Sequence, residues 1–246
     1  MNIGLYQSAA SLSALERWQD AVSQNITSSQ VSGYKKRTVD ISAQLMGEHA
    51  ADKNTRVGDG MPAYFPRASY GISYQAGEVE PTRRDLDVAI QGEGFFAIQT
   101  SDGSKIYTRA GEFTMRNDRT LINASGAEVL SDGGNPIMAT PQGGPIVINK
   151  DGSVYQRDVL LGKLQVVKFE DNSRLRPRGS GGFVANGMDP IPVEKPEVIQ
   201  GYLEGSNITP LREMVDLVTI SRAYEANQKL IQSRDDLFGK ALEKLG

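Results

Sequence analysis

The sequence predicts an α+β protein, with a central all-β domain and long N- and C-terminal helices that pack in a coiled-coil-like layer on assembly. Apolar residues recur at heptad spacing near both ends of the chain, whereas the middle holds short apolar runs separated by turn residues. The content of 26 Gly and 11 Pro in 246 residues also favours β structure with many turns over a helical bundle.

Residues 1–33 are expected to form an N-terminal helix followed by a signature segment. Apolar side chains occupy the a and d positions of one heptad frame, at Leu5, Leu12, Leu15, Val22 and Ile26. Gly33 follows this segment. We expect it to be a structural turn that closes the helix, because glycine adopts a positive φ without steric cost.

Residues 34–76 show no sustained hydrophobic period and contain Gly58, Gly60, Pro62 and Pro66. Glycine and proline at this density interrupt regular elements. We therefore expect an extended arm here, not a packed element.

Residues 77–197 are expected to form the β domain. The strand candidates are short apolar or alternating runs, namely Leu86–Ile90, Phe95–Thr100, Lys105–Thr108, Glu112–Met115, Glu128–Leu130, Ile146–Ile148 and Leu161–Phe169. Between them stand turn residues that tolerate positive φ, such as Asp102-Gly103 and Asp151-Gly152. Aromatic residues in these runs are interpreted as core.

Residues 198–246 are expected to carry the C-terminal helix, from about Pro210 to Lys244 and roughly 50 Å long at 1.5 Å per residue. Proline suits the first helical turn. The apolar positions form a long seam at Leu217, Ile220, Tyr224, Ile231, Phe238 and Leu245. So long a seam exceeds what a small β domain can bury, so the terminal helices pair either with each other or with copies of themselves.

Composition and charge exclude several classes of function. A net charge of −3 gives no electrostatic reason to expect nucleic acid or an anionic membrane as a partner. The basic run at residues 35–37 is interpreted as a solvated stretch. The absence of cysteine excludes disulfides, thiolate metal sites and a cysteine nucleophile. No apolar run approaches the roughly 18 residues of a membrane span, and the first residues do not have the pattern of a secretory signal.

No residue pattern indicates catalysis, a cofactor or a metal, and we expect no small-molecule substrate. The single histidine, His49, has no partner motif and is interpreted as a surface residue. Asp85 and Asp87 are interpreted as charge partners of Arg83 or Arg84 or as simply solvated, not as a catalytic pair. Gly92-Glu93-Gly94 leads into a strand and is interpreted as a turn, not a dinucleotide loop. The glycosylation matches at Asn25 and Asn207 are interpreted as coincidental.

Four stretches, in order along nearly the whole chain, are similar to one family. They are NITSSQVSGYK at residues 25–35, LDVAIQGEGFF at 86–96, YTRAGEF at 107–113 and QGYLEGSNI at 200–208, the last followed by EMV and RAYE. The first departs from the family's usual pattern at Thr27, Ser28 and Val31. With these motifs, the sequence resembles the flagellar basal-body rod and hook proteins, within them the FlgF/FlgG family, and most of all the proximal rod type.

The resemblance implies a structural subunit, not an enzyme, that builds the basal-body rod by axial self-assembly through its terminal helices. Its partners would be copies of itself, other rod subunits and the flagellar type III export apparatus. It would reach the periplasm-spanning rod without a cleaved signal peptide. The heptad residues of both terminal helices, Leu5 to Ile26 and Leu217 to Leu245 as given above, would then be the assembly interface.

Three alternatives remain open from the sequence. A closed coiled-coil dimer with a β head shows the same terminal heptads as a filament subunit. A distal rod subunit shares the family motifs. An all-β enzyme would need a deep pocket with perturbed acids in the β domain.

Overall fold

The computed structural model describes residues 3–49, 61–141, 143–179 and 181–243. The chain divides into two compact units. The helical unit comprises Met1–Thr27, Arg37–Ile72 and Thr209–Gly246, and the β unit comprises Ser28–Lys36 and Ser73–Ile208. One helix stands near each end of the chain with mainly β structure between them, which confirms the α+β class.

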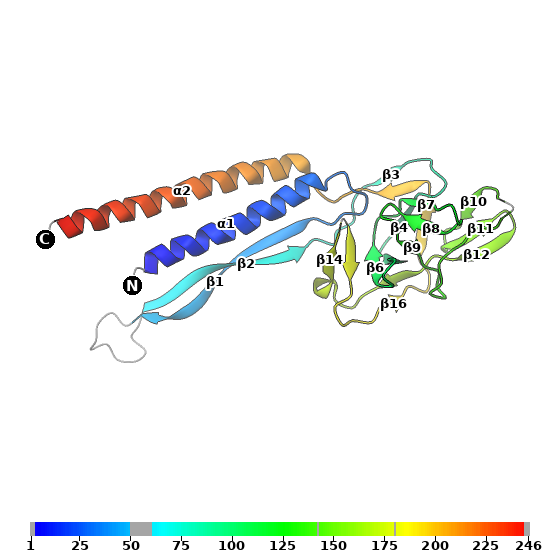
Figure 1. Cartoon of the computed structure of the whole chain (residues 1–246), viewed down its shortest axis with the longest axis horizontal. Coiled ribbons are helices and arrows are strands. Elements are labelled where there is room, and N and C mark those ends of the chain that lie inside the picture. Colours follow the sequence, from blue (N-terminus) through cyan, green and yellow to red (C-terminus); the bar gives the residue numbers. More distant parts are fainter. Residues whose placement is uncertain (1–2, 50–60, 142, 180, 244–246) are drawn as a thin grey trace. The chain divides into compact units, whose positions relative to one another are not determined.

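The helical unit is built on helices α1 (Ile3–Thr27) and α2 (Pro210–Glu243), which run antiparallel side by side (Figure 1). Helix α2 begins at the expected Pro210, and its 34 residues span about 50 Å. The two helices contact each other through a shared hydrophobic cluster. Of the two pairings that the sequence left open, the chain therefore shows the pairing of its terminal helices with each other.

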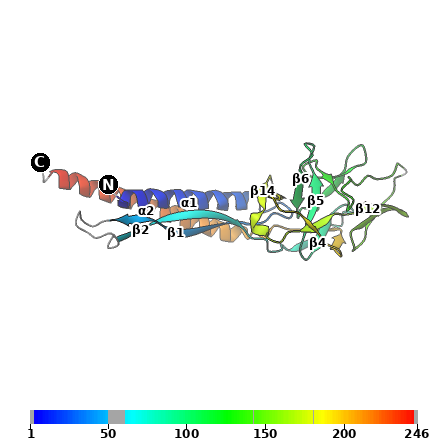
Figure 2. The ribbon, with the colours of Figure 1, turned by 90° about the horizontal axis from the view of Figure 1, so that it is seen from below.

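A two-stranded antiparallel ribbon, β1 (Arg37–His49) and β2 (Met61–Ile72), lies along α1 on the side away from α2 (Figures 1 and 2). Its register pairs Val39 with Tyr70 and Ile41 with Ala68, which places these apolar side chains on one face. Arg17 of α1 donates from Nη1 to the Ala68 carbonyl at 3.5 Å. The expected arm thus contains paired strands in its described part. Residues 50–60, with Gly58 and Gly60, lie outside the described residues.

The β unit holds the remaining strands. Their bounds are β3 (Val79–Pro81), β4 (Val88–Gln91), β5 (Phe95–Gln99), β6 (Lys105–Thr108), β7 (Phe113–Met115), β8 (Leu121–Asn123), β9 (Glu128–Val129), β10 (Ile146–Ile148), β11 (Ser153–Gln156), β12 (Val159–Lys163), β13 (Val166–Lys168), β14 (Arg176–Arg178), β15 (Gly182–Val184), β16 (Ile191–Pro192), β17 (Glu197–Gln200) and β18 (Tyr202–Glu204), with a 3₁₀ turn at Asn172–Arg174. A nine-stranded sheet runs in the order β14-β15-β6-β5-β9-β8-β7, with β13 joined to β5 and β16. Smaller sheets are β10-β11-β12, β17-β4 and β18-β3.

The core of the β unit is extensive. Phe96 and Val88 are fully buried, and Val129, Leu164 and Val198 are each 1% exposed. A second group of rings, with Phe95 and Phe183 at its centre, packs edge to face or tilted at centroid separations of 5.5 to 6.2 Å. Edge-to-face packing suits the ring quadrupoles. The expected core role of the aromatic strand residues is confirmed for Phe95 and Phe96.

The predicted strands at 105–108 and 146–148 have the observed bounds of β6 and β10. The single strand predicted over Leu161–Phe169 is wrong, since it divides into parts of β12 and β13. Between them, the Leu164 and Gln165 amides donate to the carbonyls of Gly152 and Leu130, outside the ladders of these two strands. The β unit also extends past the expected 77–197, because β17 and β18 belong to it.

Candidate assembly surfaces

The facing sides of α1 and α2 form an apolar seam. Leu15, Val22 and Ile220 are 8%, 2% and 0% exposed. Partly buried side chains pack around them, namely Trp18, Ile26, Leu217, Ala223 and Tyr224. These heptad residues therefore pack against each other within the chain, so exposure of this part of the seam to water does not explain assembly.

Other residues of the expected assembly interface lie farther along the helices. Leu12 and Ile231 are half-buried. Leu5 and Phe238 stand on α1 and α2, but their side chains lie outside the described part of the structure. Leu245 lies outside the described residues altogether.

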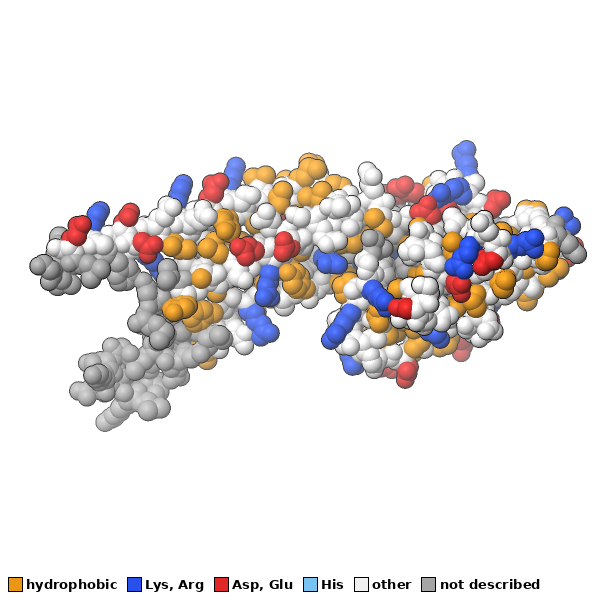
Figure 3. Space-filling view, viewed as in Figure 1, with side chains coloured by type: hydrophobic (Ala, Val, Ile, Leu, Met, Phe, Trp, Pro, Cys, Tyr) orange, Lys and Arg blue, Asp and Glu red, His pale blue; other side chains and the backbone are white. Residues whose placement is uncertain are grey.

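The opposite side of α2 carries an exposed apolar stripe that the heptad analysis missed. Leu211, Met214, Val215 and Val218 are 73%, 51%, 58% and 52% exposed. At 100° per residue, Val218 points about 160° away from the buried Ile220. Figure 3 shows hydrophobic side chains gathered over the first part of α2. We call these four residues the outer stripe. A helix that is apolar on two sides is typical of a buried helix.

A polar clamp fixes the first turn of α2 to the end of α1. Asn25 is 1% exposed, and its Oδ1 accepts from the Arg37 amide while its Nδ2 donates to the Arg37 carbonyl, both at 2.9 Å. The same Nδ2 donates to Glu213 Oε2 at 2.9 Å. Both side chains are buried, so the clamp fixes the start of β1 and the start of α2 against α1. Asn25 therefore has a structural use, in line with reading its sequon as coincidental.

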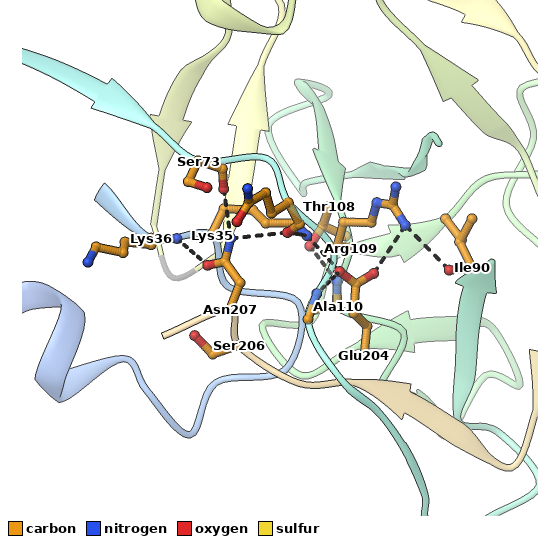
Figure 4. Close-up of polar contacts among 12 residues, drawn as sticks. Lys35, Lys36, Ser73, Ile90, Thr108, Arg109, Ala110, Glu204, Ser206 and Asn207 are labelled. Carbon is orange, nitrogen blue, oxygen red and sulfur yellow. Dashed lines mark hydrogen bonds and ion pairs between the residues drawn. The ribbon is translucent and has the colours of Figure 1, made fainter. Parts of the chain in front are cut away.

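In the β unit, a buried ionic network centres on Glu204, which is 1% exposed (Figure 4). Lys35 donates from Nζ to Glu204 Oε1 at 2.6 Å, and Arg109 donates from Nη1 to Oε2 at 3.1 Å. The amide of Gly77 also donates to Oε1, at 3.1 Å. Arg109 reaches the Gly92 carbonyl from Nη2 at 2.6 Å. One carboxylate thus joins segments that are distant in sequence.

The interpretation of residues 35–37 as solvated is wrong for Lys35, which is 3% exposed. Burial lowers the pKa of its ammonium group, and the hydrogen bond that this group donates to Glu204 only partly opposes that shift. A charged side chain is tolerated there because its ammonium group donates hydrogen bonds to the Glu204 carboxylate and the Gln75 carbonyl. The sequence offered no local sign of this, since the partners are 169 residues apart.

Asn207 ties the same region together. Its Oδ1 accepts from the Lys36 amide at 2.7 Å, and its Nδ2 donates to the carbonyls of Ser73 and Gln75 at 2.9 and 3.0 Å (Figure 4). Like Asn25, Asn207 is the asparagine of a sequon match, and its side-chain amide forms hydrogen bonds within the chain.

Gly33 sits where a side chain has no room. Its φ is +66°, its amide donates to the Glu204 carbonyl at 2.7 Å, and a Cβ would lie 2.3 Å from the Ala110 nitrogen. The expectation that it closes the N-terminal helix needs correction, because α1 ends at Thr27. Gly33 instead brings the segment after the helix against the Arg109–Ala110 backbone.

Comparison with known proteins gives two family models and several full-length relatives. The model for the flagellar basal body rod FlgEFG protein C-terminal matches residues 199–244, and the flagellar hook protein FlgE/F/G D1 domain matches 89–156. A flagellar basal-body rod protein FlgF of Caulobacter vibrioides is 32% identical over 100% of this chain and 99% of its own length. The chain belongs to the FlgF/FlgG family of flagellar basal-body rod proteins.

Further relatives in this family include a FlgF of Mesorhizobium japonicum, 29% identical over 100% of this chain and 99% of its own. A FlgG of Agrobacterium fabrum is 29% identical over 93% of this chain and 94% of its own. Within the family, the chain is most like FlgF.

The four stretches that resemble this rod family meet at the ionic network. Lys35, Gly92, Arg109 and Glu204 come from one stretch each, and the hydrogen bonds given above join them. The motifs therefore mark a structural junction of the β unit. The sequence showed each motif but not their convergence.

The remaining expectations about polar residues can be placed in this rod-family chain. Arg84 bonds Asp87 from Nε at 2.7 Å and Glu112 from Nη2 at 2.9 Å, which confirms charge pairing for Asp87. Gly92 and Gly94 have φ of 93° and 131° between β4 and β5, which confirms a turn. The His49 side chain lies outside the described part. No cluster of three metal-binding side chains occurs among the described residues, and no described helix could span a membrane.

Proposed function

We propose that this chain is a structural subunit of the bacterial flagellar basal-body rod that assembles axially with copies of itself and other rod subunits through its helical unit. Family membership along the full chain supports the rod role. The outer stripe of α2 is the observation that supports assembly through the helices. No enzymatic step is part of the proposal.

The outer stripe explains how helices could assemble although their inner seam is already occupied. Exposing four large apolar side chains on adjacent turns is unfavourable in water, and burying them against a neighbouring subunit removes that cost. The α1–α2 pair of each subunit would turn the outer stripe toward a neighbouring subunit. The helix pairs of successive subunits would then form a coiled-coil-like layer. The seam residues would then act on assembly indirectly, by holding α2 in place. Half-buried Leu12 and Ile231 could still contact a neighbour directly.

We further propose the proximal rod position and delivery through the flagellar type III export apparatus without a cleaved signal. End-to-end similarity to FlgF proteins supports the proximal position. The chain has no cysteine, so no disulfide would hinder export in an unfolded state. Partial dissociation of purified basal bodies would test the position: the chain should remain with the fragment nearest the inner membrane. Its release with the distal fragment would support the distal alternative.

The test of assembly uses two α2 variants, Val215→Asp in the outer stripe and Gln228→Asp at an exposed polar position. Each adds one negative charge to an exposed helix position, so both purified variants should unfold like the wild type. Only Val215→Asp should lose incorporation into basal bodies, and with it motility, because its carboxylate would be buried without a partner. Normal incorporation of Val215→Asp would exclude the outer stripe as an assembly surface.

A closed dimer with a β head remains the second candidate, since the outer stripe could also pair with itself. Mass measured against concentration separates the two. A dimer reaches a plateau at twice the chain mass, whereas an open, head-to-tail contact does not.

A further inference from the structure

An acidic groove lies on the β unit between the segment after α1 and the paired strands β3 and β18. Its volume is about 440 Å³. Glu78 and Glu80 form one wall, Ser29 and Ser206 contribute hydroxyls, and Leu203 and Ile208 are also part of the lining. The groove is therefore acidic at its rim and partly apolar inside.

The carboxylates of Glu78 and Glu80 are available to a ligand outside the chain. Glu80 lies on β3, and Glu78 directly precedes that strand, with its carbonyl accepting from the Gly205 amide at 2.7 Å. Both residues line the same groove. Both side chains are exposed, and neither carboxylate has a hydrogen-bond or ion-pair partner among the described residues. Strand pairing of Glu80 with Leu203 fixes the position of this wall. Two carboxylates held this close favour a cationic partner.

The same chain carries a matching basic surface on edge strand β14. Arg176 and Arg178 lie on β14, and Arg174 ends the 3₁₀ turn just before it; all three are exposed. Among the described residues, Arg178 alone of the three has an ion-pair partner, Asp102, at 3.0 Å. Among the described strands β14 pairs only with β15, and Pro177 removes one backbone donor from the edge. This edge is therefore suited to contacts through its side chains, not to strand addition. Figure 3 shows acidic side chains beside basic ones in the region of β3, and basic side chains over β14.

We propose that the acidic groove of one subunit receives the arginines of strand β14 from a second copy of this chain. The inference rests on the proposed rod function and specifies one contact between neighbouring subunits of the rod. Arginine suits the groove because its guanidinium can bridge two carboxylates while its methylene stem covers apolar surface. The two surfaces differ, so the contact is head to tail and does not close on itself unless the subunits form a ring.

Cysteine cross-linking tests the contact directly, because the chain contains no cysteine. Cells producing both a Glu80→Cys chain and an Arg176→Cys chain are oxidised, and their basal bodies are analysed on non-reducing gels. We expect a cross-linked dimer from the mixture and none from either variant alone. Replacing Arg176→Cys by Val147→Cys, an equally simple change at a 46% exposed site on β10, should lower the yield at least tenfold.

Charge exchange gives a second, independent readout. Glu80→Arg and Arg176→Glu should each lower incorporation into basal bodies, and combining both changes in one chain should restore it. Wild-type incorporation of both single variants, or a mixed-cysteine yield no higher than the Val147→Cys control, overturns the contact while leaving the rod function intact. Absence of the wild-type chain from basal bodies contradicts the rod function itself, and the contact with it.

Discussion

The β unit and the helical unit differ in how many of their apolar side chains each buries within itself. In the β unit, one hydrophobic cluster draws residues from strands across the whole unit, from Val88 in β4 to Val198 in β17. Among the described residues, the cluster between the helices has three buried members, Leu15, Val22 and Ile220. Large apolar side chains of α2 remain exposed. The larger buried core therefore lies in the β unit, whereas the helical unit leaves apolar surface exposed for contacts with other chains.

Buried polar groups sharpen the contrast. In the β unit, Glu204 accepts hydrogen bonds from two cations and an amide, so several segments depend on one carboxylate. In the helical unit, Asn25 and Glu213 join only the adjoining ends of α1, β1 and α2. Toward the far end of α1, the hydrogen bond from Gln7 Nε2 to the Tyr64 carbonyl, at 3.1 Å, is exposed to solvent. We expect the far halves of the helices to open most easily in the free chain.

The largest effect is expected for Glu204→Gln in the β unit. The change leaves Lys35 and Arg109 buried without their carboxylate, which should lower the free energy of unfolding by about 3 to 5 kcal/mol. Denaturant unfolding of the purified chain measures this. The matched control is Glu80→Gln, an exposed position where the change should stay within about 0.5 kcal/mol. A loss below about 1 kcal/mol for Glu204→Gln would show that the network contributes little.

A smaller and more local effect is expected for Ile220→Ala in the helical unit. Ile220 is fully buried, so truncation should cost about 2 to 5 kcal/mol in the free energy of opening the helix pair. The β unit should keep its unfolding transition. Val218→Ala, two residues away and 52% exposed, is the control and should have little effect. If Ile220→Ala shifted both units equally, they would not be energetically separate. Protease sensitivity of the helices, compared with that of the β unit, distinguishes these outcomes.

The smallest effect concerns alkaline pH and Tyr74 in the β unit. Burial, followed by the charge of Asp171, raises the pKa of the Tyr74 hydroxyl to about 12. Unfolded tyrosine loses its proton near pH 10, so the unfolded state binds fewer protons between about pH 10 and 12. This contribution to stability therefore falls as pH rises through that range.

Tyr74→Phe should remove this alkaline loss. At pH 11, the variant should gain about 1 kcal/mol relative to the wild type, compared with their difference at pH 7. Tyr70→Phe, at a 58% exposed ring on β2, is the control. Identical pH profiles for Tyr74→Phe and the wild type would contradict the proposed cause.

Local signals allowed parts of this fold to be predicted. The bounds of β6 and β10 and the start of α2 follow from apolar runs and proline placement. The β1–β2 ribbon was missed because Pro62 and Pro66 argue against a strand, although a ribbon edge tolerates proline. Alternation at Val39 and Ile41 is visible in hindsight, but its significance depends on pairing with Tyr70 and Ala68, about 30 residues away.

The candidate surfaces were less predictable than the elements. A heptad frame identifies one seam, so it found Ile220 but passed over Val215 on the opposite side. Whether a seam faces its own chain or another depends on tertiary packing, which periodicity does not encode. Glu204 lay inside a motif whose meaning as a junction requires knowing that Lys35 and Arg109 converge on it.

Hydrogen exchange of the dilute free chain tests the central contrast most directly. Amides of the β unit core, such as those of Phe96 and Ile98, should exchange only through global unfolding of that unit. Amides along α1 and α2 should exchange at an opening free energy lower by at least about 2 kcal/mol, and should become protected in isolated basal bodies. Equal protection of helices and β core in the free chain, unchanged in basal bodies, would contradict the account.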